Sequence, residues 1–243
     1  MPTYTRNYLT QVVFQLSFKQ IENIQAGLLP EFSKFIQEEI PKSSIITKQA
    51  FVLSFASNTS PSQKVINQWA FQGEKLSVIV SQDSIQIQNK SYTNYNDYHP
   101  KIVSIVNKFI ELYEPITSNV SIRYVNNISF SEGSTYDFGN LISADLLAPT
   151  NKLRGSNNLS RSLGTATMQD GDLTTRYSYG FSNSSYPNLI SKREFLIDID
   201  SSKPFNSSDS ISNAISNIRT KVNALFELSI EDGLRGKMNA PNS

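Results

Sequence analysis

Cysteine is absent from this chain of 243 residues, and histidine occurs once, as His99. Without cysteine the chain cannot form disulfides, thiolate nucleophiles, zinc fingers or cysteine-ligated iron–sulfur clusters. A serine–histidine–aspartate triad would have to use His99, and metal motifs that need two histidines are excluded. We therefore expect no cofactor, and the composition favours a protein that is not an enzyme.

An excess of one charge is also lacking. Lys and Arg number 22 against 21 Asp and Glu, which leaves a formal net charge of +1. Such a chain has no overall field that attracts DNA, RNA or an anionic membrane, so we do not expect nucleic acid as a partner. Charged residues make up 18% of the chain, below the roughly 25% of an average soluble protein. The surface is therefore largely uncharged, and we expect a protein partner or a second copy to cover part of it.

Long apolar runs are missing as well. No stretch approaches the roughly 18 uninterrupted apolar residues of a membrane-spanning helix. The N-terminal residues are polar, include Arg6 and contain no apolar core of a secretion signal. We expect a cytoplasmic protein that does not enter a membrane.

The first half of the chain shows the two spacings that distinguish strands from helices. In 11–19, Val12, Phe14, Leu16 and Phe18 alternate with polar residues, as in a strand with one buried face. The same rules predict the other elements of this half, which are a helix over 30–41, strands over 50–56, 65–71, 76–80 and 85–87, and a helix over 98–114.

The second half repeats this order of elements. Asp170-Gly171-Asp172, between two alternating segments, predicts a β-hairpin, and Ser207, Ser208 or Asp209 can cap a long last helix. The predicted elements of this half are a strand over 120–130, a helix over 136–147, strands over 161–169, 173–181 and 193–200, a helix that reaches 226, a frayed tail over 231–236, and mobile loops over 149–160 and 182–191.

These elements predict an α+β fold in which helices cover one face of an antiparallel sheet or sheets. Both halves read as a strand, a helix, three or four strands and a helix, which we interpret as an internal duplication. The expected halves are 1–115 and 116–243, packed together as one module. The second face of the sheet is then available for recognition.

Three short blocks carry a family resemblance. The opening strand is Val12-Val13-Phe14-Gln15-Leu16-Ser17-Phe18, and the central block is Ile122-Arg123-Tyr124-Val125-Asn126-Asn127-Ile128. The closing block consists of Lys221, Phe226, Glu227, Ser229-Ile230 and Arg235. Together they resemble an uncharacterised prokaryotic family of proteins of about this length that is named for its sporadic distribution. The resemblance implies a single complete module and brings no activity, cofactor or catalytic residue. Asn127 stands where the family often has a basic residue.

Two arginines are the leading candidates for binding. Ile122 and Tyr124 point to the apolar side of their strand, so Arg123 projects from the opposite face, together with Asn127. Arg176 projects in the same way from its own strand, and Tyr179 follows three residues later. We predict that Arg123, Asn127, Arg176 and Tyr179 bind a small anionic ligand or a partner. The alternative, which we favour, is that the arginines pair with Asp198 and Glu194 across strands.

Asp198 and Asp200 lie two apart on a predicted strand, so their carboxylates share a face. Paired carboxylates could hold Mg²⁺ or Mn²⁺, but alternating acidic and aliphatic residues are also typical of a solvated strand face. We favour the solvated face, with these two residues as weak metal candidates. His99 lies at a predicted helix start, between Asp97 and Pro100, where capping explains the pattern.

These observations favour a non-enzymatic interaction or regulatory module that acts with a partner protein. The sporadic distribution of the resembled family suggests a prokaryotic defence or conflict system. A sensor of a small anion or nucleotide, bound between the two halves, is the first alternative. A nucleic-acid-binding saddle is the second, because the TATA-binding fold has a similar order of elements.

Overall fold

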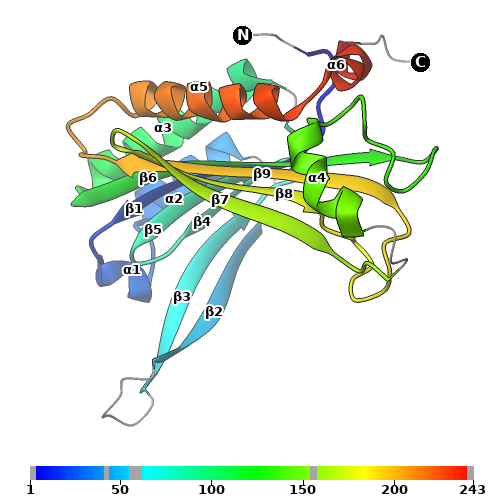
Figure 1. Cartoon of the computed structure of the whole chain (residues 1–243). Coiled ribbons are helices and arrows are strands. Elements are labelled where there is room, and N and C mark those ends of the chain that lie inside the picture. The colour runs from blue at the N-terminus through cyan, green and yellow to red at the C-terminus, as the bar shows by residue number, and fades with distance from the viewer. Residues whose placement is uncertain (1–3, 41–43, 55–61, 93, 154–157, 240–243) are drawn as a thin grey trace. The chain divides into compact units, whose positions relative to one another are not determined.

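The computed structural model describes residues 4–40, 44–54, 62–92, 94–153 and 158–239, and it has an α+β fold (Figure 1). The first half contains β1 (Leu9–Phe18), α1 (Asn23–Ala26), α2 (Pro30–Glu39), β2 (Ser44–Ser54), β3 (Ser62–Gln72), β4 (Leu76–Val80), β5 (Ser84–Asn89) and α3 (Tyr95–Tyr113). The second half contains β6 (Thr117–Phe130), α4 (Ala144–Leu153), β7 (Ser162–Asp170), β8 (Leu173–Phe181), β9 (Arg193–Pro204), α5 (Ile211–Ser229) and α6 (Asp232–Asn239).

Backbone contacts divide the chain into two compact units. Unit 1 comprises the residues up to Val12, the segment Ile122–Lys203 and the residues from Ser216 onward. Unit 2 comprises Val13–Ser121 and Pro204–Ile215. These bounds differ from the expected halves 1–115 and 116–243, because β1, β6 and α5 each contribute residues to both units.

Unit 2 contains an antiparallel sheet with the strand order β2-β3-β4-β5-β1-β6. The residues Phe14, Leu16 and Phe18 are buried on one face, as the alternation predicts. Helices α2 and α3 cover this face, where Phe109 lies 5.1 Å from Phe18 and 5.5 Å from Phe32 between ring centroids. The polar face carries glutamines that bond to one another, for example Gln86 to Gln15 at 2.8 Å.

Unit 1 contains the strand order β1-β6-β9-β8-β7. Its core is aromatic, since the ring of Phe181 lies 5.7 Å from that of Phe138 and 5.2 Å from that of Phe195. Helix α5 lies on the apolar face of these strands, because Tyr177 of β8 shares a hydrogen bond with Ser229 of α5 at 2.7 Å. Burial of this apolar face leaves the opposite face of the strands with polar side chains.

The predicted hairpin is confirmed. β7 ends at Asp170 and β8 begins at Leu173, with a continuous antiparallel register from Ser162 opposite Phe181 to Asp170 opposite Leu173. Gly171 has a φ of +59°, a conformation that glycine adopts at low cost.

The predicted helix over 136–147 is wrong, because the helix in this region is α4, Ala144–Leu153. Phe138, Leu141 and Ile142 are buried, as their spacing suggested. Their segment is not helical, since Ile142 forms an antiparallel bridge with Ile230 and Leu141 accepts a backbone hydrogen bond from Glu231. The spacing of the apolar residues therefore predicted which side chains are buried. The backbone conformation was decided by pairing with the distant segment around Ile230.

The prediction that the tail over 231–236 is frayed is also wrong. It forms α6, in which Leu234 and Met238 are buried. Arg6 donates a backbone hydrogen bond to Met238, and Tyr4 donates to Glu227 at 2.6 Å. Contacts with the first described residues of the chain therefore hold this segment, a long-range effect that local composition does not reveal.

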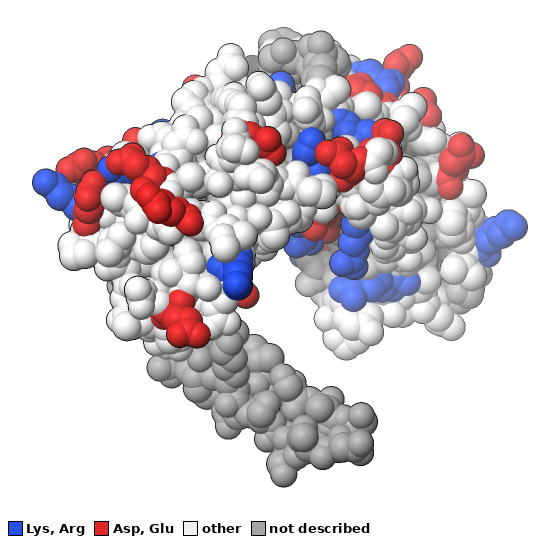
Figure 2. Space-filling model, turned by 90° about the vertical axis from the view of Figure 1, so that its left-hand side faces the viewer, with Lys and Arg blue, Asp and Glu red and all other residues white. Residues whose placement is uncertain are grey.

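The two halves have similar element orders, but an internal duplication stays a prediction. Within the residues that the structure describes, no helix is long and apolar enough to cross a membrane. The face of the molecule in Figure 2 is mostly uncharged, with acidic and basic side chains in small groups, in line with the low charge content.

Two glycines of unit 1 test this fold. Gly180 has a φ of +130°, and a Cβ atom there would overlap the carbonyl oxygen of Ser162 on β7. We expect Gly180→Ala to lower the free energy of unfolding by at least about 2 kcal/mol, because the backbone is strained and cannot yield. Gly236 in α6 has open space around it, so Gly236→Ala should raise stability by about 0.5–1 kcal/mol. Urea denaturation of both variants measures these changes, and equal effects would contradict the β7–β8 register.

Candidate functional site

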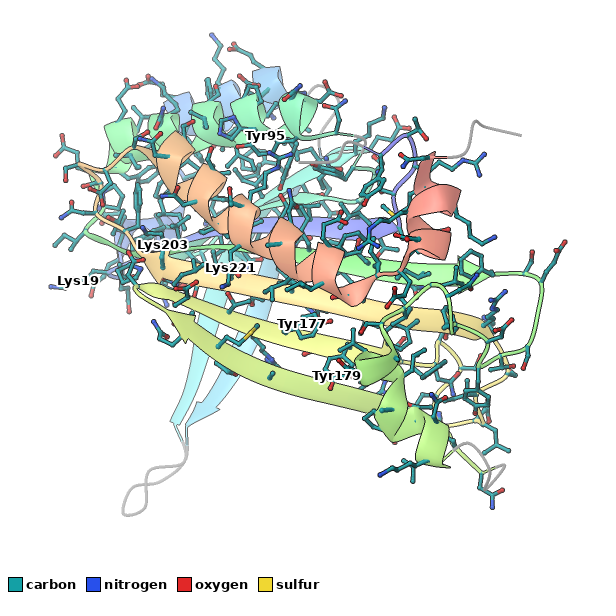
Figure 3. The ribbon with its side chains drawn as sticks, turned by 45° about the horizontal axis from the view of Figure 1, so that its top comes forward. Lys19, Tyr95, Tyr177, Tyr179, Lys203 and Lys221 are labelled. Carbon is teal, nitrogen blue, oxygen red and sulfur yellow. The ribbon has the colours of Figure 1, made fainter. Side chains whose placement is uncertain are left out.

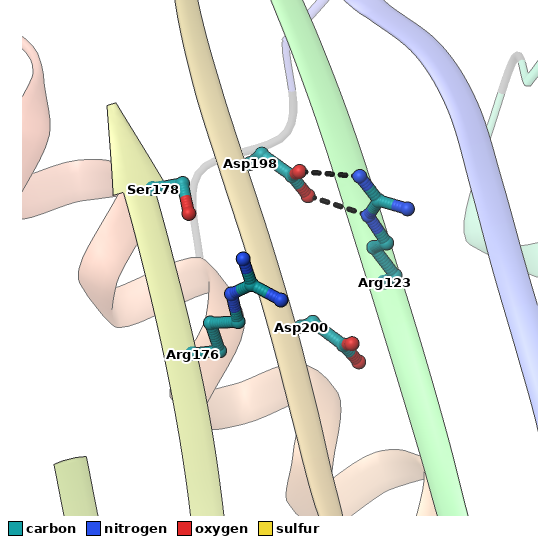
Figure 4. Close-up of a pocket in the computed structure, with 5 residues that line it drawn as sticks. All are labelled: Arg123, Arg176, Ser178, Asp198 and Asp200. Atoms are coloured by element: carbon teal, nitrogen blue, oxygen red, sulfur yellow. Dashed lines mark hydrogen bonds and ion pairs between the residues drawn. The ribbon is translucent and has the colours of Figure 1, made fainter. Parts of the chain in front are cut away.

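A small polar pocket lies on the face of unit 1 opposite the helices. Arg123 on β6, Arg176 and Ser178 on β8, and Asp198 and Asp200 on β9 line it (Figure 4). Strand alternation brings them together, since all five project from the same side of three neighbouring strands. The cavity volume is about 110 Å³, below the roughly 300–1,000 Å³ of pockets that enclose a drug-sized ligand. The pocket therefore has room for one functional group of a larger molecule.

Arg123 on β6 and Asp198 on β9 form a bidentate ion pair along one wall of the pocket. The Nε and NH2 atoms of Arg123 donate to the two carboxylate oxygens of Asp198 at 2.8 and 2.5 Å. The Asp198 side chain is 14% exposed, against 48% for Arg123. The hydrogen bonds to Asp198 raise the pKa of Arg123. The predicted pairing of these two residues is confirmed, and it makes this wall of the pocket close to neutral.

Arg176 differs from Arg123 because its guanidinium has no such partner among the residues that the structure describes. Asp200 stands directly opposite Arg176 in the β8–β9 register, and the Arg176 side chain extends across β9 toward the space between the two aspartates (Figure 4). Within the described part of the chain, the guanidinium forms no hydrogen bond or ion pair. A planar group with five donors is thus presented to the pocket.

The predicted pairing of an arginine with Glu194 is wrong. Glu194 is buried, and its carboxylate accepts a hydrogen bond from the backbone N–H of Ser184 in the loop after β8. The strand register explains the difference, since Arg176 stands opposite Asp200 rather than opposite Glu194.

Asp200 is the titratable group that the pocket perturbs most clearly. Burial raises the pKa of Asp200, and the nearby negative charge of Asp198 acts in the same direction. The positive charges of Arg123 and Arg176 oppose this rise without cancelling it. Asp200 therefore takes up a proton more readily than an exposed aspartate as the pH falls.

Ser178 belongs to the pocket although the sequence analysis did not select it. It lies two residues after Arg176, and this spacing on a strand is the signal that could have identified it. Its hydroxyl shares a 3.2 Å hydrogen bond with the hydroxyl of Thr165 on β7.

The structure does not bring all four predicted binding residues together. Tyr179 lies on the other face of β8, where α5 passes and where its ring is 5.3 Å from that of Tyr177 (Figure 3). The ring covers Gly164 of β7. Alternation explains the separation, since Arg176 and Tyr179 are an odd number of residues apart and must project from opposite faces.

Asn127 lies on the same face of β6 as Arg123 but outside the pocket lining. Its backbone N–H donates to Tyr8 at 2.9 Å. Its side-chain oxygen is buried without a hydrogen-bond partner among the described residues. Of the four predicted binding residues, Arg123 and Arg176 therefore share a site, together with the weak metal candidates Asp198 and Asp200.

The predicted metal site at Asp198 and Asp200 would need a third ligand among the described residues. Asp198 and Asp200 do share a face, as predicted, but Asp198 is already held by Arg123. Across the described ranges, no group of three or more His, Cys, Asp or Glu residues is placed to hold a metal ion. His99 lies in α3, stacked on Tyr95 at 4.7 Å, and its Nε2 is 3.2 Å from the Ser212 hydroxyl.

Comparison with known proteins adds no identity to this geometry. No protein-family model matches the chain, and no curated protein matches it. The resemblance to a sporadically distributed prokaryotic family therefore stays a prediction, and the function has to be argued from the pocket.

Proposed function

We propose that this protein is a non-enzymatic binding module whose pocket on β6, β9 and β8 takes an anionic group. The group is a carboxylate or phosphate, carried by a small ligand or by a partner protein. The observation that carries the proposal is the guanidinium of Arg176, which faces the pocket without a hydrogen bond or ion pair among the described residues.

The chemistry of the lining fits such a group. A guanidinium presents parallel N–H donors whose spacing matches the two oxygens of a carboxylate or phosphate. The hydroxyl of Ser178 lies on the same strand face and can donate a further hydrogen bond. Arg123 contributes less, because Asp198 occupies two of its donor atoms. Arg176 is thus the anchor, and the Arg123–Asp198 pair forms a fixed wall beside it.

The same lining favours binding over catalysis. Ser178 is the hydroxyl among the five lining residues, and its hydrogen-bond partner is Thr165 rather than a general base. A serine nucleophile needs a base within hydrogen-bond reach. A role beside a partner protein in prokaryotic defence belongs to the same proposal and is supported by the family resemblance.

Removal of the Arg176 charge tests the anchor. We expect sulfate, phosphate and acetate at millimolar concentration to shift the Arg176 Nε–H resonance in two-dimensional NMR spectra of the ¹⁵N-labelled protein. Arg176→Gln should weaken anion binding at least about tenfold, since a hydrogen bond to a charged group contributes roughly 1.5–3 kcal/mol. Lys192→Gln, which removes the same charge from an exposed position of unit 1, should leave the affinity unchanged. Equal losses in both variants, or no response to any anion, would refute the proposal.

The raised pKa of Asp200 makes anion binding depend on pH. As the pH falls through this pKa, Asp200 loses its negative charge beside Arg176, so the affinity for an anion should rise. Sulfate is the suitable probe because its own charge stays constant in this range. Asp200→Asn should bind sulfate about fivefold more tightly at neutral pH, the equivalent of about 1 kcal/mol for neighbouring charges in water. Titration calorimetry at several pH values measures both effects, and an affinity of the wild type that falls on acidification would contradict them.

A further inference from the structure

β7 is the outermost strand of the unit 1 sheet. One of its edges pairs with β8 over its whole length, from Ser162 opposite Phe181 to Asp170 opposite Leu173. Among the residues that the structure describes, no strand pairs with the other edge. A strand in this position presents a row of backbone N–H and C=O groups that can pair with another chain.

The sequence of β7 lacks the features that usually block such pairing. Native proteins protect edge strands with lysine, proline, a bulge or a covering helix. Residues 162–169 read Ser-Leu-Gly-Thr-Ala-Thr-Met-Gln, with no charge and no proline. The register with β8 runs without a bulge. α4 contacts the beginning of the strand, where Thr150 bonds to Ser162 at 2.7 Å, while residues 165–167 are exposed.

The start of β7 also carries exposed apolar side chains. Leu163 is 45% exposed, and Tyr186 and Leu189 in the loop after β8 are 53% and 52% exposed. This loop lies beside the β7 start, because Asn183 donates to the Ser160 carbonyl at 2.8 Å and the Arg161 guanidinium lies 4.4 Å from the centre of the Tyr186 ring. These side chains add exposed apolar surface near the start of β7 that a partner could bury.

We propose that the free edge of β7 pairs antiparallel with β7 of a second copy of this chain. The strand is complementary to itself, since its uncharged middle is bounded by Arg161 at one end and Asp170 at the other. Asp170 also forms an ion pair with Lys221 of α5 at 2.7 Å, and its side chain stays largely exposed. A twofold axis perpendicular to the sheet places the Arg161 end of one copy beside the Asp170 end of its partner. Such an isologous contact is the commonest route to a homodimer.

The side chains at the centre fit this symmetry. In a register centred on Thr165, that threonine faces the partner's Thr165 on one side of the sheet, and Thr–Thr pairs stabilise antiparallel strands. On the other side of the sheet, Gly164 faces the partner's Ala166, and the Tyr179 ring that covers Gly164 lies beside this pair. The axis keeps both copies of the sheet facing the same way, so the pockets of the two copies open on the same face of one continuous sheet.

Charge variants at the exposed positions 165 and 167 test this interface. Sedimentation velocity of the wild type should show a species of twice the 27.3 kDa chain mass that dissociates on dilution. Thr165→Lys/Thr167→Lys and Thr165→Glu/Thr167→Glu should each be monomeric, because like charges then face each other in registers centred on residue 165 or 166. An equimolar mixture of the two variants should restore the dimer.

The controls separate this inference from folding defects and from the anion pocket. Asn217→Lys/Thr220→Lys adds the same charges to the exposed face of α5 and should remain dimeric. Circular dichroism and thermal melting should match the wild type in every variant. Arg176→Gln should keep the dimer, so the two proposals can fail independently. A wild type that is monomeric up to its solubility limit, a dimer that persists in both charge variants, or a mixture that stays monomeric would each overturn the inference.

Discussion

The burial of one face of each sheet under helices is the constraint on which the other features depend. It places apolar side chains such as Phe14 in unit 2 and Tyr177 in unit 1 on the covered side. Because successive side chains of a strand alternate between faces, the neighbouring positions must project from the other side. The polar pocket of unit 1 is therefore a consequence of how β6, β8 and β9 bury their apolar residues. A shift of one residue in any of these strands would place an arginine or an aspartate in the aromatic core.

The electrostatics of the pocket follow from the fact that only one of its two arginines is bonded to one of its two aspartates. Asp198 bonds to Arg123, whereas Asp200 and Arg176 face each other across the register without a hydrogen bond. An arginine that is already paired with a carboxylate has little left to offer a ligand, whereas an unpaired one retains all its donors. Burial raises the pKa of Asp200, so the charge beside Arg176 depends on protonation of a neighbouring strand residue. Recognition of an anion and its dependence on pH thus come from the same group of residues.

Backbone hydrogen bonding supplies the second constraint on this protein. Every buried N–H and C=O group needs a partner, and strands supply these partners through their neighbours. The segment around Ile142 pairs with Ile230 rather than forming a helix. No other described strand pairs with the outer edge of β7. The low charge content of the chain has its local counterpart in the uncharged residues 162–169. An interface along β7 would place two anion pockets on one sheet and so join the two proposals structurally.

Local patterns in the sequence predicted most of the strands, the helix after Pro30 and the hairpin at Gly171, because alternation, helical spacing and turn residues act over a few neighbours. The same patterns placed Arg123 on the face of its strand that is opposite to the face of Ile122, and they predicted its ion pair with Asp198. The spacing within β8 also contains the information that Ser178 shares a face with Arg176 and that Tyr179 does not, although our prediction did not use it. Only the tertiary structure decided that Arg176 faces Asp200 without a hydrogen bond. The same holds for the nonhelical segment before α4 and for the ordered α6. These outcomes depend on the register and pairing of segments far apart in the chain, and the free energy of such pairing is not encoded in the spacing of residues within any one segment.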